Sequence, residues 1–141
     1  MFLNAYEFEL ENEAGESIDV SLRLTISGQM ALKKKWKEST TDTLFGAMDD
    51  IERMVDVMTK ALTYTGNKNT IKTGEELVDL MAANGMLGMA NKQKVITAIG
   101  QTSGIFSEKE KEAIDTRAER MIEKALAGLD EDESEEEVKN A

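Results

Sequence analysis

Residues 17–27, SIDVSLRLTIS, decide the fold, because apolar and polar side chains alternate along this stretch without exception. Every second residue is apolar, and these residues are Ile18, Val20, Leu22, Leu24 and Ile26. Side chains of a β-strand point alternately to its two faces, so this alternation predicts a strand with one apolar face.

A second alternating stretch comes just before it. Glutamates separate its apolar residues, which are Phe2, Tyr6, Phe8 and Leu10. Residues 12–16 connect the two stretches, and Gly15 among them can adopt a positive φ at little cost. The sequence therefore predicts an antiparallel β-hairpin with one apolar face. A lone hairpin is only marginally stable in water, so the rest of the chain must cover that face.

The period becomes helical after Gly28, where Met30, Leu32 and Trp36 mark one side of a short predicted helix. A longer helix is predicted over residues 43–63, with an N-cap among residues 41–43 and an end at Gly66–Asn67. Its apolar residues recur at intervals of three and four, which predicts one continuous stripe. They are Leu44, Met48, Ile51, Val55, Met58 and Leu62.

Two capping boxes open further helices, at Thr73–Glu76 and at Ser107–Glu110. In this motif a hydroxyl side chain and a glutamate three residues later satisfy one another's backbone donors. The first helix is predicted to end at Asn84–Gly85, a short helix after it at Gly100, and the last one at Gly128.

The predicted fold is therefore α+β, with an N-terminal antiparallel β-hairpin followed by a bundle of four to five α-helices, in one domain of residues 1–128. Residues 129–141 differ in composition, with seven acidic side chains against one lysine, which is −6 of the net charge of −11. Charge repulsion and the near absence of apolar side chains predict that this segment is a disordered acidic tail.

The composition excludes most kinds of catalytic site. The 141 residues include no cysteine and no histidine, which removes thiol nucleophiles, thiolate ligands and the commonest general base. The carboxylates lack the spacing of a calcium loop, and no glycine-rich phosphate motif occurs. We therefore expect no enzymatic activity, no catalytic residue, and no cofactor or metal site.

Membrane and nucleic-acid partners are not expected either. No segment is long and apolar enough to span a bilayer, and no signal peptide is seen, so the sequence predicts a cytoplasmic protein. Lys33, Lys34, Lys35 and Lys37 surround Trp36, but one turn of lysines in so acidic a chain is a poor footprint for nucleic acid. A solvated helix face with Trp36 turned inward is the simpler interpretation, although the cluster could also hold the acidic tail of the same or a neighbouring molecule.

Methionines are the most suggestive residues of the helical half. Unbranched thioether side chains suit a surface that accepts varied apolar partners. The candidate partner-binding residues are Met86, Leu87 and Met89, which lie among glycines, together with Met54 and Met58 on the long helix. The alternative is that these methionines fill gaps in the core.

The order of several short motifs carries a resemblance. The motifs are YEFEL (residues 6–10), VSLRLT (20–25), LKKK (32–35), TL (43–44), ELVDLM (76–81), and Ile99 with SGIF (103–106). In this order they resemble the tail assembly chaperones of long-tailed phages, in particular the small acidic proteins encoded just before the tape-measure protein in phages and prophages of Gram-positive bacteria. The similarity covers about residues 2–127. The chain departs from it at residues 37–39, where a glycine is expected to end the lysine-rich helix.

The resemblance implies a non-enzymatic chaperone that binds the tape-measure protein and the tail-tube protein in the host cytoplasm and is absent from the mature virion. Self-association is a further option. Two alternatives from other classes remain open. One is a tail-completion or adaptor protein that stays in the virion. The other is an acidic decoy that inhibits a host nucleic-acid-binding protein, although a decoy should carry its charge on a folded face.

Overall fold

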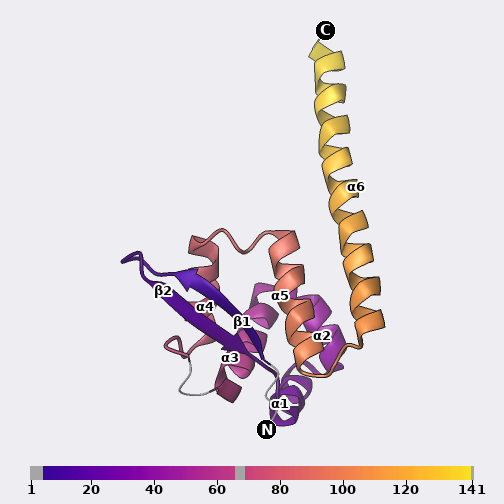
Figure 1. The fold of residues 1–141 in the computed structure, drawn as a ribbon. Helices are drawn as coiled ribbons and strands as arrows, with labels where there is room; N and C mark the ends of the chain where they lie inside the picture. Colours follow the sequence, from indigo (N-terminus) through magenta and orange to yellow (C-terminus); the bar gives the residue numbers. More distant parts are fainter. Residues whose placement is uncertain (1–4, 66–68, 141) are drawn as a thin grey trace.

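The computed structural model describes residues 5–65 and 69–140, so the predictions for Phe2, Gly66 and Asn67 lie outside the described residues. It confirms the α+β class, with an antiparallel hairpin followed by helices, of which the described part contains six (Figure 1). The elements are β1 (Tyr6–Glu11), β2 (Ser17–Leu22), α1 (Ile26–Trp36), α2 (Thr40–Ala47), α3 (Ile51–Thr65), α4 (Gly74–Ala83), α5 (Met89–Thr102) and α6 (Glu108–Asn140).

The hairpin has the predicted face and turn. Phe8 pairs with Val20, Leu10 pairs with Ile18, and Gly15 adopts a φ of +78°. The second strand, however, ends at Leu22 and not at Ile26. Thr25 is instead the N-cap of α1, where its hydroxyl accepts a hydrogen bond from the amide of Gly28 (3.0 Å). Ile26 therefore begins a helix and is 70% exposed, because the cap ends the alternation that the sequence suggests.

The predicted helix over residues 43–63 is wrong, because it is two helices. Ser39 caps α2 by accepting from the amide of Asp42 (3.1 Å), and residues 48–50 form a turn. The Asp50 carboxylate then accepts from the amide of Glu52 (3.0 Å) at the start of α3. The break rotates the apolar stripe, so that Ile51 is 56% exposed and Val55 is only half-buried.

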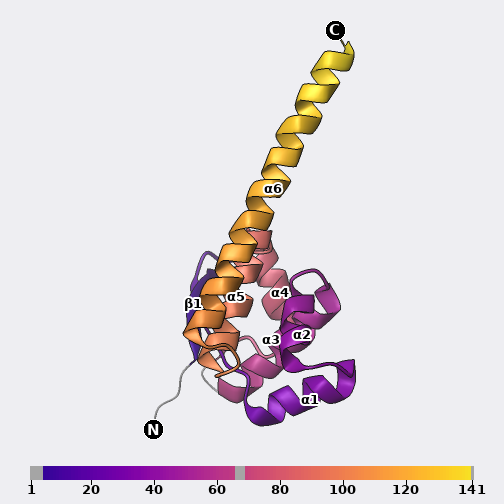
Figure 2. The ribbon, with the colours of Figure 1, turned by 90° about the vertical axis from the view of Figure 1, so that its right-hand side faces the viewer.

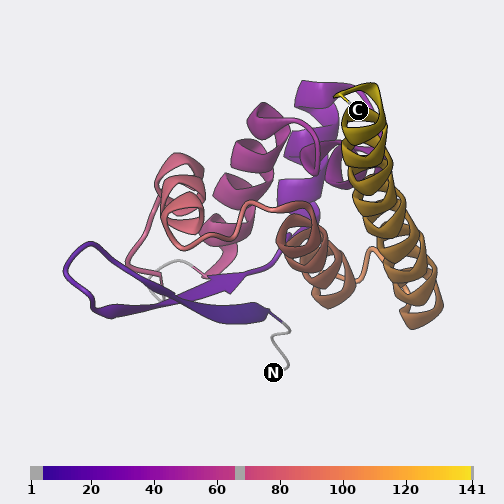
Figure 3. The same ribbon diagram turned by 90° about the horizontal axis from the view of Figure 1, so that it is seen from above.

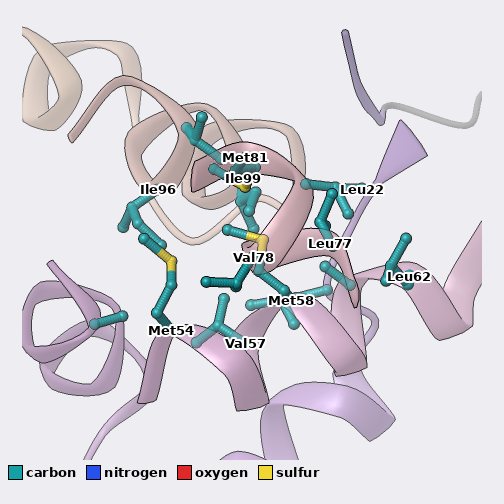
Figure 4. Packing of buried hydrophobic residues seen from close by; sticks show 14 of the residues in the cluster. Leu22, Met54, Val57, Met58, Leu62, Leu77, Val78, Met81, Ile96 and Ile99 are labelled. Carbon is teal, nitrogen blue, oxygen red and sulfur yellow. The ribbon is translucent and has the colours of Figure 1, made fainter. Parts of the chain in front are cut away.

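The core lies between the hairpin and the helices (Figures 3 and 4). Helices α3, α4 and α5 contact the strands, and each contributes residues that pack against those of its neighbours. The labelled core residues of Figure 4 come from β2 and these three helices: Leu22, Met54, Val57, Met58, Leu62, Leu77, Val78, Met81, Ile96 and Ile99. These helices supply the cover that a two-stranded hairpin requires.

Two asparagine side chains fasten the hairpin at its edges. Asn84, just after α4, accepts from the amide of Glu11 (3.0 Å) and donates to its carbonyl (2.9 Å). Buried Asn69 does the same for Ser21 on β2, at 2.8 and 3.0 Å. A side-chain amide carries one donor group and one acceptor, so each asparagine replaces part of a missing neighbouring strand.

The first residue of α4 lies against α3. A Cβ atom at Gly74 would be 2.2 Å from the carbonyl oxygen of Val55 and 2.3 Å from the hydroxyl oxygen of Thr59. The same hydroxyl accepts from the amide of Gly74 (3.0 Å) and donates to the Val55 carbonyl (2.9 Å). The hydrogen bonds and the close approach therefore depend on the absence of a side chain.

The last two helices extend further than predicted. Gly100 does not end α5, which continues to Thr102; the glycine packs against the ring of Phe106, which a Cβ would meet at 2.3 Å. Ser107 caps α6 as predicted, by accepting from the amide of Glu110 (3.1 Å).

Helix α6 does not end at Gly128 but continues to Asn140, over a length of about 50 Å. Its second half projects beyond the rest of the molecule (Figures 1 and 2). Glutamate is a good helix former and no proline interrupts this segment, which explains why the helix extends past the predicted end. The division into a domain of residues 1–128 and a disordered acidic tail of residues 129–141 stays a prediction.

Gly74→Ala should lower the free energy of unfolding by several kcal/mol, because the new methyl group has no room between α3 and α4. Gly128→Ala is the matched control, since nothing lies within 4 Å of its Cβ position and alanine favours a helix by about 1 kcal/mol. Chemical denaturation of both variants measures the difference. Equal stability of the two would contradict the close approach.

Lys37 ends α1 in the left-handed region, with a φ of 56°, at the position where the resemblance leads us to expect a glycine. Lys37→Gly should therefore raise the free energy of unfolding by about 1 kcal/mol, because a side chain is unfavourable at this φ. Lys34→Gly, inside the same helix, should lower it by about 1 kcal/mol. Thermal melting compares them, and destabilisation by both changes would argue against a left-handed cap.

Candidate functional site

Helices α2, α5 and α6 lie on one side of the molecule (Figure 2). An apolar groove opens between them. Its volume is about 240 Å³. It is lined by Phe45, Met48, Asp49, Met89, Gln93, Ile114, Arg117 and Met121. Helix α2 supplies Phe45, the turn after it Met48 and Asp49, and the other residues come from α5 and α6.

Several large apolar side chains of the groove are exposed to solvent. Phe45 is 38% exposed, Met89 is 48% exposed and Met121 is 52% exposed. The ring of Phe45 packs against the buried ring of Phe106, at 5.9 Å between ring centroids. Exposed apolar side chains gathered in a groove between helices are typical of a site for an apolar partner.

One hydrogen bond joins two walls of the groove. Gln93 on α5 donates it to the carboxylate of Asp115 on α6. Asp49 and Arg117 also line the groove and supply one charge of each sign. The groove thus combines exposed apolar side chains with a few polar ones, which is a lining that an amphipathic helix fits.

The structure separates the five candidate partner-binding residues. Met89 lies in the groove, whereas Met86 and Leu87 are half-buried between α4 and α5 and pack against the core. Met54 and Met58 are fully buried in the core. Neither of these two side chains reaches the surface, so both fill the core, as in the alternative interpretation.

Phe45, Met48, Ile114 and Met121 were not predicted to bind a partner, although they line the groove. Ile114 and Met121 are seven residues apart, so they share one face of α6, and that spacing was a usable signal. Phe45 had none, because its exposure results from how α2 packs beside α5.

Arg53 of α3 contacts both Trp36, at the end of α1, and Glu38 just after it. The Arg53 guanidinium lies 4.4 Å from the centroid of the Trp36 ring and also pairs with Glu38 (2.8 Å) and with Asp50. The hydrogen bond from Arg53 lowers the pKa of the Glu38 carboxyl. Burial acts to raise the pKa of Asp50, but hydrogen bonds from Arg53 and the Glu52 amide outweigh it and lower that pKa. These contacts connect the start of α3 to the end of α1. The charge of Arg53 is therefore paired within the protein.

The described part of the chain contains neither a candidate metal cluster nor a helix suited to span a membrane. Within residues 5–65 and 69–140, no cluster of three or more acidic side chains is placed to hold a metal ion. Among the helices in that part of the chain, none combines the length and apolar character needed to span a bilayer.

Acidic substitutions should separate groove residues from core residues. Met121→Asp should leave the melting temperature nearly unchanged, because the side chain is already in contact with water. Met58→Asp should unfold the protein, because a buried unpaired charge costs several kcal/mol of a total stability of about 5–15 kcal/mol. Circular dichroism during heating measures both, and unfolding of the Met121 variant would place that residue in the core.

Comparisons with known proteins found no similar protein. No family model matches the chain, and neither the curated proteins nor the solved structures yield a match.

Proposed function

We propose that this protein is a tail assembly chaperone, which binds a helical segment of the tape-measure protein in the groove between α2, α5 and α6. The exposed apolar side chains that line that groove are the observation that carries the proposal. The proposal also draws on the resemblance, which implies a partner that is long, helical and largely apolar. Such a polypeptide aggregates unless its apolar faces are covered.

The side chains of the groove suit this partner. Met48, Met89 and Met121 supply flexible thioethers that adapt to different apolar side chains, so one groove can accept successive segments of a long helix. The chain's net charge of −11 would keep a coated complex apart from other complexes through repulsion.

The rest of the proposal follows from the resemblance. The tail-tube protein is the second proposed partner, bound before the tube polymerises. The chaperone acts in the host cytoplasm, without catalysis and without a cofactor, and leaves the assembly before the virion is complete.

Co-expression with the tape-measure protein of the same phage or prophage tests the groove. The wild-type chain should keep the tape-measure protein in the soluble fraction and co-purify with it. The double variant Met89→Asp/Met121→Asp should fold normally and lose both effects, because the partner would have to desolvate two carboxylates in the groove.

Ile26→Asp/Met30→Asp is the matched control, because it also adds two carboxylates. Both residues are exposed on α1, at 70% and 67%, and neither lines the groove. It should behave as the wild type. Equal loss of solubility with the control would mean that general surface charge, and not the groove, determines the effect. Full activity of the double variant would overturn the proposal.

A further inference from the structure

The outer edge of β1 carries backbone groups that face away from β2. In an antiparallel pair, alternate residues direct their N–H and C=O groups outward. The amide of Asn12 donates to the carbonyl of Glu16 (2.9 Å), which sets the order of this alternation. The bonds from Asn84 to Glu11 and from Asn69 to Ser21 fall on outward-facing residues and agree with it. The backbone N–H and C=O groups of Glu7 and Glu9 on β1 therefore point outward as well.

Three other outward positions of the hairpin pair with the rest of the molecule, whereas on the far edge of β2, within the described residues, Ser17 and Asp19 do not. The side chain of Asn84 pairs with the backbone of Glu11, and that of Asn69 pairs with the backbone of Ser21. The amide of Arg23 donates to the carbonyl of Ala61 (3.2 Å). Within the described residues, the outward groups of Glu7 and Glu9 have no such partner. Two consecutive outward positions of β1 thus remain open for pairing.

The two faces beside this open edge differ in chemistry. On the outer face, the side chains of Glu7, Glu9, Asp19 and Ser21 surround a concavity of about 440 Å³, which Phe8 and Val20 between them also line. On the other face, Tyr6 and Phe8 are half-buried, with their rings stacked at 5.2 Å between centroids. A strand added at this edge would place alternate side chains beside carboxylates and beside aromatic rings.

We propose that the open edge of β1 at Glu7 and Glu9 binds an extended segment of a partner protein, in which lysine or arginine alternates with apolar residues. The backbone of that segment pairs with the free groups of Glu7 and Glu9. Its basic side chains lie over the glutamates, and its apolar side chains lie beside Tyr6 and Phe8.

Charge decides against a second copy of this chain as the occupant. Pairing of two β1 edges would bring the glutamates of both copies side by side, and like charges on facing strands are unfavourable. Acidic side chains along an edge prevent self-pairing in this way while leaving the edge open to a basic segment. This surface lies on the hairpin and is separate from the groove, so the inference does not depend on the proposed function.

A short peptide of alternating valine and lysine, added to the full-length protein, tests the inference by amide NMR. It should shift the amide signals of Glu7 and Glu9 and slow their hydrogen exchange. Glu7→Lys/Glu9→Lys should weaken this binding about tenfold or more and should bind a peptide of alternating valine and glutamate instead. Glu13→Lys/Glu16→Lys has the same change of charge in the exposed turn and should bind as the wild type does.

A proline substitution separates backbone pairing from charge. Glu9→Pro removes one outward donor and leaves the bonds between β1 and β2 in place, so it should weaken binding. Asp19→Pro makes the same change on β2 and should not. The inference is wrong if both charge variants weaken binding equally, if Glu9→Pro binds as the wild type does, or if the peptide shifts the groove residues instead of Glu7 and Glu9.

Discussion

Asn69 and Asn84 make hydrogen bonds that a hairpin of two strands lacks. Each side-chain amide pairs with both backbone groups of one strand residue, in the way that a neighbouring strand would. Asn84 follows α4, whereas Asn69 comes before it, so both ends of one helix are fixed to the hairpin. The apolar face of the strands is thereby held over α3, α4 and α5, and the core depends on this placement.

The same placement separates the two surfaces to which we assign partners. One face of α5 packs in the core with Val95, Ile96 and Ile99, and Met89 and Gln93 of the same helix line the groove. The open edge of β1 belongs to the hairpin. The two proposed binding surfaces therefore lie on separate parts of the molecule, so a helix bound at one would not compete with an extended segment bound at the other.

Local signals explain what could be predicted from the sequence. The alternation along the strands, Gly15 in the turn, and the caps at Thr73 and Ser107 each depend on a few neighbouring residues. The break between α2 and α3 was missed because the apolar spacing continues through it, while Ser39 and Asp50 determine where the two helices start. The groove was missed for another reason: Phe45, Met89 and Met121 meet only through tertiary packing, and spacing alone cannot distinguish exposed Met89 from buried Met58. The contact of Asn69 spans 48 positions of the sequence and that of Asn84 spans 73, and neither follows a periodic pattern.

Asn84 is also a site where the protein can be deamidated. It precedes Gly85, and an asparagine beside a glycine is open to attack on its side-chain amide by the next backbone nitrogen, which releases ammonia and leaves a carboxylate after hydrolysis. In the folded protein the Gly85 nitrogen donates to the carbonyl of Ala82 (3.0 Å) and the Asn84 amide is engaged with Glu11, so both reacting groups are restrained. Once deamidated, residue 84 could no longer donate to the Glu11 carbonyl and would add a negative charge beside an acidic strand. Ageing of the protein would then loosen β1 at the end nearest the turn, and the reaction would be faster wherever these restraints are lost.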